Sequence, residues 1–211
     1  NLKFKSSTNR SPTKTTEGKI GLTKTLKLEL RLLADIGLLG KPNAGKSSLV
    51  EAVSSAKPKI ADYEFTTLYP SLGVVDYSPL SSFVISDIPG LITGASKGVG
   101  LGIQFLKHLS RTRLILTVID IFDKDYQEIV TEVEELINEV REYNKDLESK
   151  IVWLVLNKID LIDAEEVNKL VKQLESNYKD KLRVSCISAA QRNGTKDLMR
   201  DIGRYLESVD G

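Results

Sequence analysis

A short run of small residues that ends in Lys-Ser has the composition of a phosphate-binding loop. The segment Gly40-Lys41-Pro42-Asn43-Ala44-Gly45-Lys46-Ser47 matches the pattern G-x-x-x-x-G-K-S/T. Its glycines let backbone N–H groups turn towards phosphate oxygens, and a following helix adds partial positive charge at its N-terminus. We expect Lys46 to reach the β and γ phosphates and Ser47 to ligate the Mg²⁺ that bridges them. The alternative, a turn with a helix cap, does not require this spacing.

Two further segments carry groups that can respond to a γ phosphate. Asp87-Ile88-Pro89-Gly90 follows an apolar stretch, where Asp87 is expected to hold Mg²⁺ through water and the N–H of Gly90 to meet the γ phosphate. We therefore expect Lys46 and Gly90 to be the catalytic residues. A hydroxyl of Thr66-Thr67 can complete the coordination of Mg²⁺ when the triphosphate is bound. The glycine-rich segment 94–102 is either a mobile switch or a plain flexible loop.

The segment Asn157-Lys158-Ile159-Asp160 has the groups needed to recognise guanine. The Asp160 carboxylate can accept from both the ring N–H and the exocyclic amine of guanine, a donor pair that adenine lacks. We expect Asn157 to bond the other edge of the base and Lys158 to lie along its face. Ser188-Ala189-Ala190 would offer a backbone N–H to the guanine oxygen. The pattern predicts GTP or GDP as the ligand and leaves an ATPase as the minor alternative.

These segments follow apolar stretches that alternate with helical patterns. The alternation predicts an α/β fold of the P-loop NTPase type, with a mostly parallel central sheet, helices on both faces and ligands at the carboxyl ends of the strands. The expected strands lie near 36–39, 72–76, 83–86, 114–119, 151–156 and 182–187. The expected helices lie near 45–55, 101–111, 126–143, after 164, and at 196–206.

Composition narrows the class of protein. The chain has 211 residues, a formal net charge of +1 and one cysteine, and it contains no apolar run of the roughly eighteen residues that a membrane span needs. These features predict a soluble, cytoplasmic protein without disulfides. We also expect a monomer, although none of these features determines the oligomeric state. The segment before residue 30 is rich in lysine, which leaves a basic RNA-binding module as one alternative and a solvated linker as another. We expect Trp153 and Cys186 to lie in the core and His108 to have no catalytic role.

The chain resembles the Obg family of GTPases, which are associated with ribosome assembly, over essentially its whole length. The segments that carry the resemblance are Phe4-Lys5-Ser6-Ser7-Thr8-Asn9-Arg10, Leu33-Ala34-Asp35-Ile36-Gly37, Pro42-Asn43-Ala44-Gly45-Lys46-Ser47, Phe65-Thr66-Thr67-Leu68 and Asp87-Ile88-Pro89-Gly90-Leu91-Ile92. The resemblance implies that residues 1–33 are the end of the glycine-rich Obg fold with a linker, and that 34–211 form the GTP-binding domain. It also implies that Thr67 rather than Thr66 binds Mg²⁺, and that Phe65-Thr66-Thr67-Leu68-Tyr69 lines the nucleotide. The chain departs from the family pattern at Lys41, Ser71, Thr93 and Ser110.

The same resemblance bears on hydrolysis and partners. Leu91 stands where many small GTPases carry a glutamine that orients water, and leucine cannot hydrogen-bond water, so slow turnover is expected. Asn43 is a candidate ligand for K⁺ near the phosphates, or it only occupies a positive-φ position of the loop. The implied partners are GTP, GDP and the large ribosomal subunit. The alternatives are a sensor of guanosine tetraphosphate (ppGpp) that docks on the ribosome with incidental hydrolysis, and a related translation-associated GTPase.

Overall fold

The computed structural model describes residues 34–60, 70–87, 100–179 and 181–210, together with single residues between 5 and 24. The chain divides into two compact units, Asn1–Leu30 and Arg31–Gly211. Within the first, bends occur at Ser7, Thr8 and Arg10. All helices and strands of the described residues belong to the second unit, which carries the predicted site.

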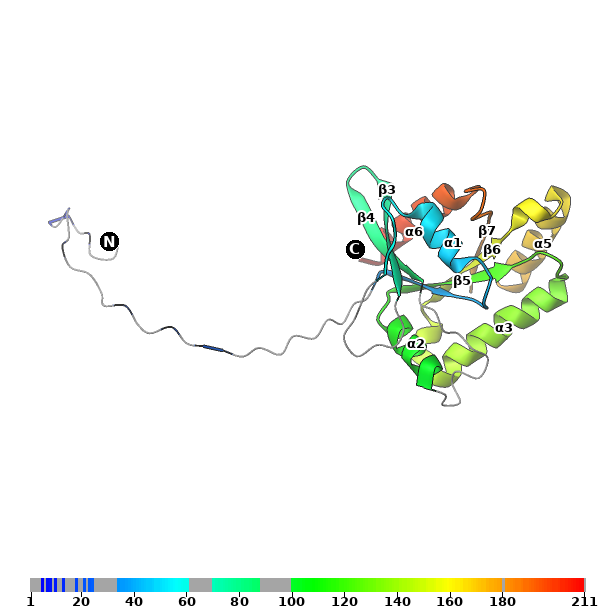
Figure 1. Cartoon of the computed structure of the whole chain (residues 1–211), viewed down its shortest axis with the longest axis horizontal. Coiled ribbons are helices and arrows are strands. Elements are labelled where there is room, and N and C mark those ends of the chain that lie inside the picture. Colours follow the sequence, from blue (N-terminus) through cyan, green and yellow to red (C-terminus); the bar gives the residue numbers. More distant parts are fainter. Residues whose placement is uncertain are drawn as a thin grey trace. The chain divides into compact units, whose positions relative to one another are not determined.

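The second unit is built on one seven-stranded sheet with the order β2-β3-β4-β1-β5-β6-β7 (Figure 1). The strands are β1 (Ile36–Leu39), β2 (Lys59–Ile60), β3 (Ser71–Ser78), β4 (Ser81–Asp87), β5 (Leu114–Asp120), β6 (Ile151–Asn157) and β7 (Arg183–Ile187). In this order, β4, β1, β5, β6 and β7 each pair in parallel with the next strand. The pairs β2–β3 and β3–β4 are antiparallel. The predicted mostly parallel α/β sheet is therefore confirmed.

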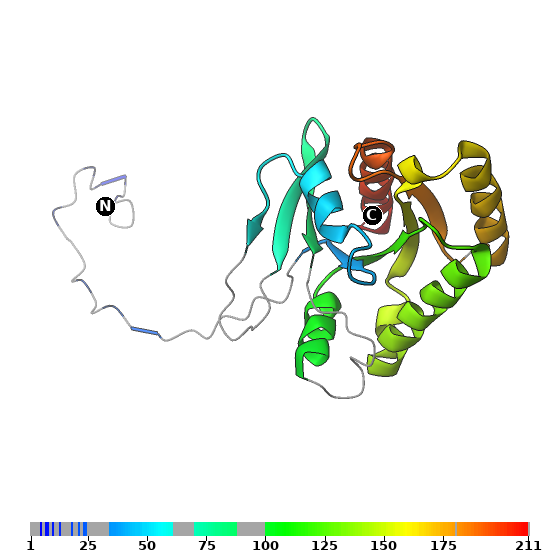
Figure 2. The same ribbon diagram turned by 45° about the vertical axis from the view of Figure 1, so that its right-hand side comes forward.

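Helices cover both faces of this sheet (Figure 2). They are α1 (Lys46–Val53), α2 (Gly100–Ser110), α3 (Tyr126–Tyr143), α4 (Lys145–Glu148), α5 (Ala164–Asn177) and α6 (Thr195–Asp210). One core cluster joins the sheet to α2, α3 and α5, and the other joins it to α1 and α6. Side chains of β5 alternate between them, with Ile115 and Ile119 in the first and Leu116 and Val118 in the second, as the two-residue period of a strand requires.

The start of α3 shows how local sequence fixes an element. Asp125 caps the helix: its side chain accepts the N–H of Glu128, and the Glu128 side chain accepts the N–H of Asp125. This capping box satisfies two N–H groups that no helical carbonyl reaches. The apolar side chains Ile129, Val133, Leu136 and Val140 recur at helical spacing and are buried. The helix spans the predicted residues 126–143, whereas the short elements β2 and α4 were not predicted.

The strand β7 forms one edge of the sheet and carries an aromatic–cation stack. The guanidinium carbon of Arg183 lies 5.1 Å from the ring centre of Trp153 and 5.2 Å from that of Tyr205 on α6. Trp153 is buried, as predicted. Cys186, also predicted to lie in the core, is only partly buried, because its strand β7 pairs only with β6 among the described strands. Burial raises the pKa of its thiol to about 11, so the thiol stays protonated at neutral pH.

No helix in the described part of the chain combines the length and the apolar character that crossing a bilayer would require.

Candidate active site

The loop between β1 and α1 has the shape of an anion cradle. Gly45 adopts a φ of 93°, in the left-handed region that favours glycine, and a Cβ at this position would overlap the side-chain nitrogen of Asn157. A Cβ at Gly40 would overlap the carbonyl oxygen of Val118. Both glycines of the pattern are therefore required by the fold. Asn43 has a φ of 65°, so it occupies a positive-φ position of the loop, which is one of the two roles expected for it.

Lys46 is held beneath this loop. Its ammonium donates to the carbonyl oxygens of Gly40 at 2.8 Å and Lys41 at 3.0 Å. Burial lowers the pKa of Lys46, and the negative charge of Asp87 opposes that shift. A partly desolvated ammonium interacts more strongly with phosphate oxygens than a fully hydrated one. The position of Lys46 is therefore suited to binding the β and γ phosphates.

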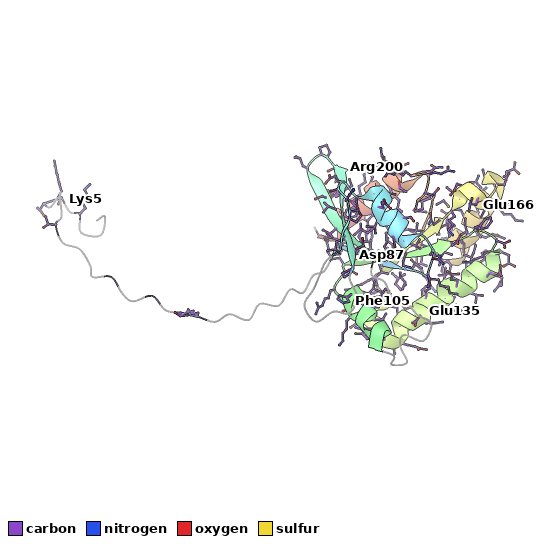
Figure 3. The ribbon with its side chains drawn as sticks, in the orientation of Figure 1. Lys5, Asp87, Phe105, Glu135, Glu166 and Arg200 are labelled. Carbon is purple, nitrogen blue, oxygen red and sulfur yellow. The ribbon has the colours of Figure 1, made fainter. Side chains whose placement is uncertain are left out.

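Ser47 and Asp87 meet at the start of α1. The Ser47 hydroxyl donates to Oδ2 of Asp87 in a short hydrogen bond. Asp87, labelled in Figure 3, lies at the end of β4 and is buried. Its Oδ1 has no hydrogen-bond partner among the described residues. A buried carboxylate oxygen without a partner is costly unless a cation or water completes it. Hydroxyl and carboxylate oxygens are ligands that suit Mg²⁺, so these two residues fit the predicted metal.

Asn157 joins the two sides of the site. Its side-chain nitrogen donates to the carbonyl of Ala44 at 2.9 Å, and its side-chain oxygen accepts the N–H of Ala189 at 3.0 Å. The residue is 2% exposed, so both bonds are shielded from water. This bridge fixes the phosphate loop against the loop after β7. The sequence pattern predicted that Asn157 bonds the edge of the base, and that contact stays a prediction. The structure adds a second role for Asn157, as the bridge between the two loops.

Lys158 and Asp160 lie just beyond the end of β6. Lys158 has a φ of 70° and its ammonium donates to Oδ2 of Asp120 at 2.6 Å, so its side chain runs across the end of β5. Asp160 belongs to a 3₁₀ turn, Ile159–Leu161. No ion pair or hydrogen bond of the Asp160 carboxylate occurs among the described contacts, and it lines the pocket next to the phosphate loop.

One pocket of about 370 Å³ collects most of the predicted residues that the structure describes. Its lining comprises Asn43, Gly45, Lys46, Ser47, Ser48, Asn157, Lys158, Asp160, Leu161, Ala189 and Ala190. The remaining member of the last predicted segment, Ser188, is fully buried; its hydroxyl accepts the N–H of Gln191, which stabilises the turn that presents Ala189 and Ala190. The groups predicted to bind the phosphates and those predicted to bind the base therefore face a common space.

Several predicted residues lie outside the described part of the chain. They are Phe65, Thr66, Thr67, Leu68 and Tyr69, together with Ile88, Pro89, Gly90 and Leu91. Their assignments remain predictions.

The structure adds three residues that sequence reasoning missed. Ser48 and Leu161 line the pocket, and Asp120 holds the ammonium of Lys158. Ser48 and Leu161 directly follow predicted site residues, so their positions in the sequence were a usable signal. Asp120 gave no such signal, because its pairing with Lys158 depends on β5 and β6 lying side by side.

His108 is buried in α2, where burial and then repulsion from Arg111 lower the pKa of its imidazole. It does not line the pocket that holds Lys46 and Asp160.

Comparison with known proteins supports the same chemistry. The sequence model of a family described as 50S ribosome-binding GTPase matches residues 35–158. Era from Aquifex aeolicus, solved with GDP and AlF4⁻, is 24% identical with a TM-score of 0.61, over 82% of this chain and 56% of the Era chain. The G domain of the FeoB iron transporter from T. maritima is 22% identical with a TM-score of 0.58, over 81% of this chain and 97% of that domain.

A nucleolar GTP-binding protein 1 from Plasmodium falciparum is 25% identical with a TM-score of 0.54, over 83% of this chain and 86% of that protein chain. This chain thus spans little more than half of the Era chain that it resembles. The family match covers more than half of this chain and includes the phosphate loop, Asp87 and Asn157-Lys158. The chain therefore belongs to the 50S ribosome-binding GTPase family and carries its guanine-nucleotide-binding GTPase domain.

Proposed function

We propose that this domain is a slow, Mg²⁺-dependent GTP switch of the Obg type that acts in the assembly of the large ribosomal subunit. The observation that carries the GTP site is the common pocket of Lys46, Ser47 and Asp160. The Obg assignment is supported by the family-specific sequence strings, above all Phe4–Arg10. On this proposal, residues 1–33 are the end of an Obg fold and 34–211 the GTP-binding domain.

The phosphate end of the site binds and orients the triphosphate. The loop 40–47 presents backbone N–H groups, and Lys46 contacts the β and γ phosphates as a point charge. Ser47, Thr67 and, through water, Asp87 would hold Mg²⁺, which supplies neutralisation of the phosphate charge when it is bound. The N–H of Gly90 would meet the γ phosphate. Loss of that phosphate would then release the segment after Asp87, which is the predicted switch.

The base end of the site selects guanine. Asp160 accepts from the ring N–H and the amine, and Lys158, steadied by Asp120, lies along the face of the base. The turn at Ala189-Ala190 presents its backbone to the guanine oxygen. By resemblance to the Obg family, the segment 65–69 would also line the nucleotide. Adenine lacks the ring N–H and amine pair that Asp160 would accept from, and it lacks the oxygen that the Ala189-Ala190 backbone would reach, so these two contacts discriminate against ATP.

The base assignment is tested by calorimetry with GDP, GTP and ATP in the presence of Mg²⁺. We expect GDP and GTP to bind and ATP not to bind, and Asp160→Ala to weaken both guanine nucleotides. Asp201→Ala is the matched control, because Asp201 is an exposed aspartate on α6 that lies 4.0 Å from Arg204 and outside this pocket. Tight binding of ATP, or equal effects of the two substitutions, would refute the guanine site.

Slow hydrolysis follows from Leu91, which cannot orient water. We expect K⁺ to accelerate single-turnover hydrolysis relative to Na⁺ through Asn43, because a cation near the phosphates offsets developing charge. Equal rates in the two salts would remove the K⁺ assignment and leave Asn43 with its positive-φ role.

The ribosomal role is tested by co-sedimentation of the protein with large ribosomal subunits in GTP and in GDP. Nucleotide-dependent binding supports a role in subunit assembly, and no binding in either state refutes it for this chain.

A second candidate function is a ppGpp sensor with incidental hydrolysis, favoured by the same Leu91. The sensor is distinguished by its affinity for ppGpp. Binding of ppGpp as tight as that of GDP, with ribosome binding altered by ppGpp, favours the sensor; binding much weaker than that of GDP excludes it.

A further inference from the structure

The second residue of the phosphate loop reaches a distant helix. The Lys41 ammonium donates to Oε2 of Glu135 at 2.9 Å, although the two residues are 94 positions apart, and it lies 4.0 Å from Oε2 of Glu132. Both glutamates belong to α3, and Figure 3 shows Glu135 on that helix. The hydrogen bond to Glu135 raises the pKa of Lys41, so the ammonium is charged throughout the neutral range. The loop is thereby attached to α3 by an ion pair.

The α3 end of this attachment is firmly built. Glu132 is 5% exposed, its Oε2 accepts from Lys124 at 2.7 Å, and its Oε1 has no partner among the described residues. A buried carboxylate with one free oxygen needs nearby positive charge, which Lys124 and Lys41 provide. The helix is also locked by the buried side chains Ile129, Val133 and Leu136. The loop residue is therefore attached to a rigid element.

The main chain of the same residue organises the phosphate loop. The Lys41 carbonyl accepts two hydrogen bonds, from the Ala44 N–H at 3.2 Å and from the Lys46 ammonium at 3.0 Å. The preceding carbonyl, of Gly40, is the other acceptor of Lys46. The two peptide groups on either side of the Lys41 Cα thus fix the direction of the Lys46 ammonium. A rotation about this Cα would misalign both acceptors at once.

We propose that Lys41 is a positioning residue, which uses its ion pair with α3 to hold the carbonyl groups that aim Lys46 at the phosphates. The proposal rests on the assignment of Lys46 to the β and γ phosphates. Lys41 itself touches no reacting atom in this scheme, so its effect on the reaction passes through Lys46.

The test measures GTP hydrolysis by the full chain under steady-state conditions, with kcat and KM determined separately. The variants are Lys41→Met, Glu135→Gln and the double variant, with Lys41→Arg as the conservative replacement. The matched control is Glu148→Gln. Glu148 lies on α4 and forms an exposed ion pair, at 2.5 Å, with Arg141 in the last turn of α3. Thermal melting of every variant reports folding independently.

We expect each single variant to lower kcat by roughly two- to fivefold, the range in which an exposed ion pair couples. The double variant should fall no further, because both substitutions break the same contact. Lys41→Arg should keep most of the rate, and Glu148→Gln all of it. Glutamine is a good helix former, so Glu135→Gln keeps α3 intact and tests the proposal even if Lys41→Met folds poorly.

Unchanged kcat in Glu135→Gln, an additive double variant, or an equal loss in Glu148→Gln would overturn the positioning role. Lys46→Met separates this failure from failure of the proposed function. If Lys46→Met hydrolyses GTP normally, the phosphate assignment itself is wrong. If Lys46→Met is inactive while Lys41→Met and Glu135→Gln keep the full rate, only the role of Lys41 is refuted.

Discussion

Replacement of Asn157 by alanine should weaken both the fold and the nucleotide site. The substitution removes the two bonds by which this side chain joins the carbonyl of Ala44 to the N–H of Ala189. Each of these backbone groups then loses its partner in a region where Asn157 itself is 2% exposed. An unsatisfied buried polar group costs about 1–3 kcal/mol. Because the substitution leaves two such groups without a partner, it should lower the free energy of unfolding by about 2–6 kcal/mol.

The measurement is urea denaturation of the nucleotide-free protein, followed by calorimetric titration with GDP. GDP affinity should fall as well, because the phosphate loop and the turn at Ala189 are no longer held against each other. Asn138→Ala is the matched control, since Asn138 is an exposed asparagine on α3 whose oxygen accepts from Arg141. We expect the control to change stability by less than about 0.5 kcal/mol. If Asn157→Ala is as stable as the control and binds GDP equally well, the bridge has no energetic role.

Three other substitutions test further features of the structure. Asp120→Asn removes the ion pair of Lys158 and should weaken GDP binding by up to roughly fivefold in calorimetry, as expected for a partly exposed pair; undiminished affinity would show that Lys158 needs no support. Gly45→Ala forces a φ of 93° on an alanine, at about 1–2 kcal/mol, and displaces Asn157, so we expect a lower melting temperature and no GDP binding; normal GDP affinity would contradict the tight packing described for this loop. His108 has a pKa lowered by burial and by Arg111, so the unfolded chain takes up a proton below about pH 6.5 that the folded protein does not. The contribution of neutral His108 to the free energy of unfolding should therefore be fully present above that pH and should be lost as the pH falls below it. In urea denaturation, the stability of His108→Leu should fall less with pH than that of the unmodified protein; an identical pH dependence in both proteins would refute this.

The parts of the fold that the sequence predicted well are those that local patterns determine. The helix at 126–143 combines an Asp-x-x-Glu capping box with apolar residues at helical spacing, and the helix predicted near 126–143 agrees with it. The strands that carry the site are apolar runs, and each run stops at a glycine or a polar residue: Gly40, Asp87 or Asn157. By contrast, β2 has only two residues and α4 four, too few for a periodic pattern to show.

The contacts that sequence reasoning could not predict are those between distant segments. Nothing near Lys41 indicates that Glu135 will be its partner, and nothing near Lys158 indicates Asp120. The role of Asn157 as a bridge needs the loops after β1 and β7 to lie on either side of the end of β6. Such pairings depend on the order of strands in the sheet. The spacing of a motif predicts only at which end of a strand a residue lies.

The cluster of Arg183, Trp153 and Tyr205 provides an intrinsic fluorescence probe of unfolding. Trp153 is the only tryptophan of the chain, and it lies buried as the third residue of β6, outside the lining of the nucleotide pocket. Its fluorescence therefore reports separation of β6, β7 and α6, with no direct contribution from groups around Lys46 or Asp160. Variants at the nucleotide site can be compared on one optical scale, because none of them alters the emitting ring or its neighbours.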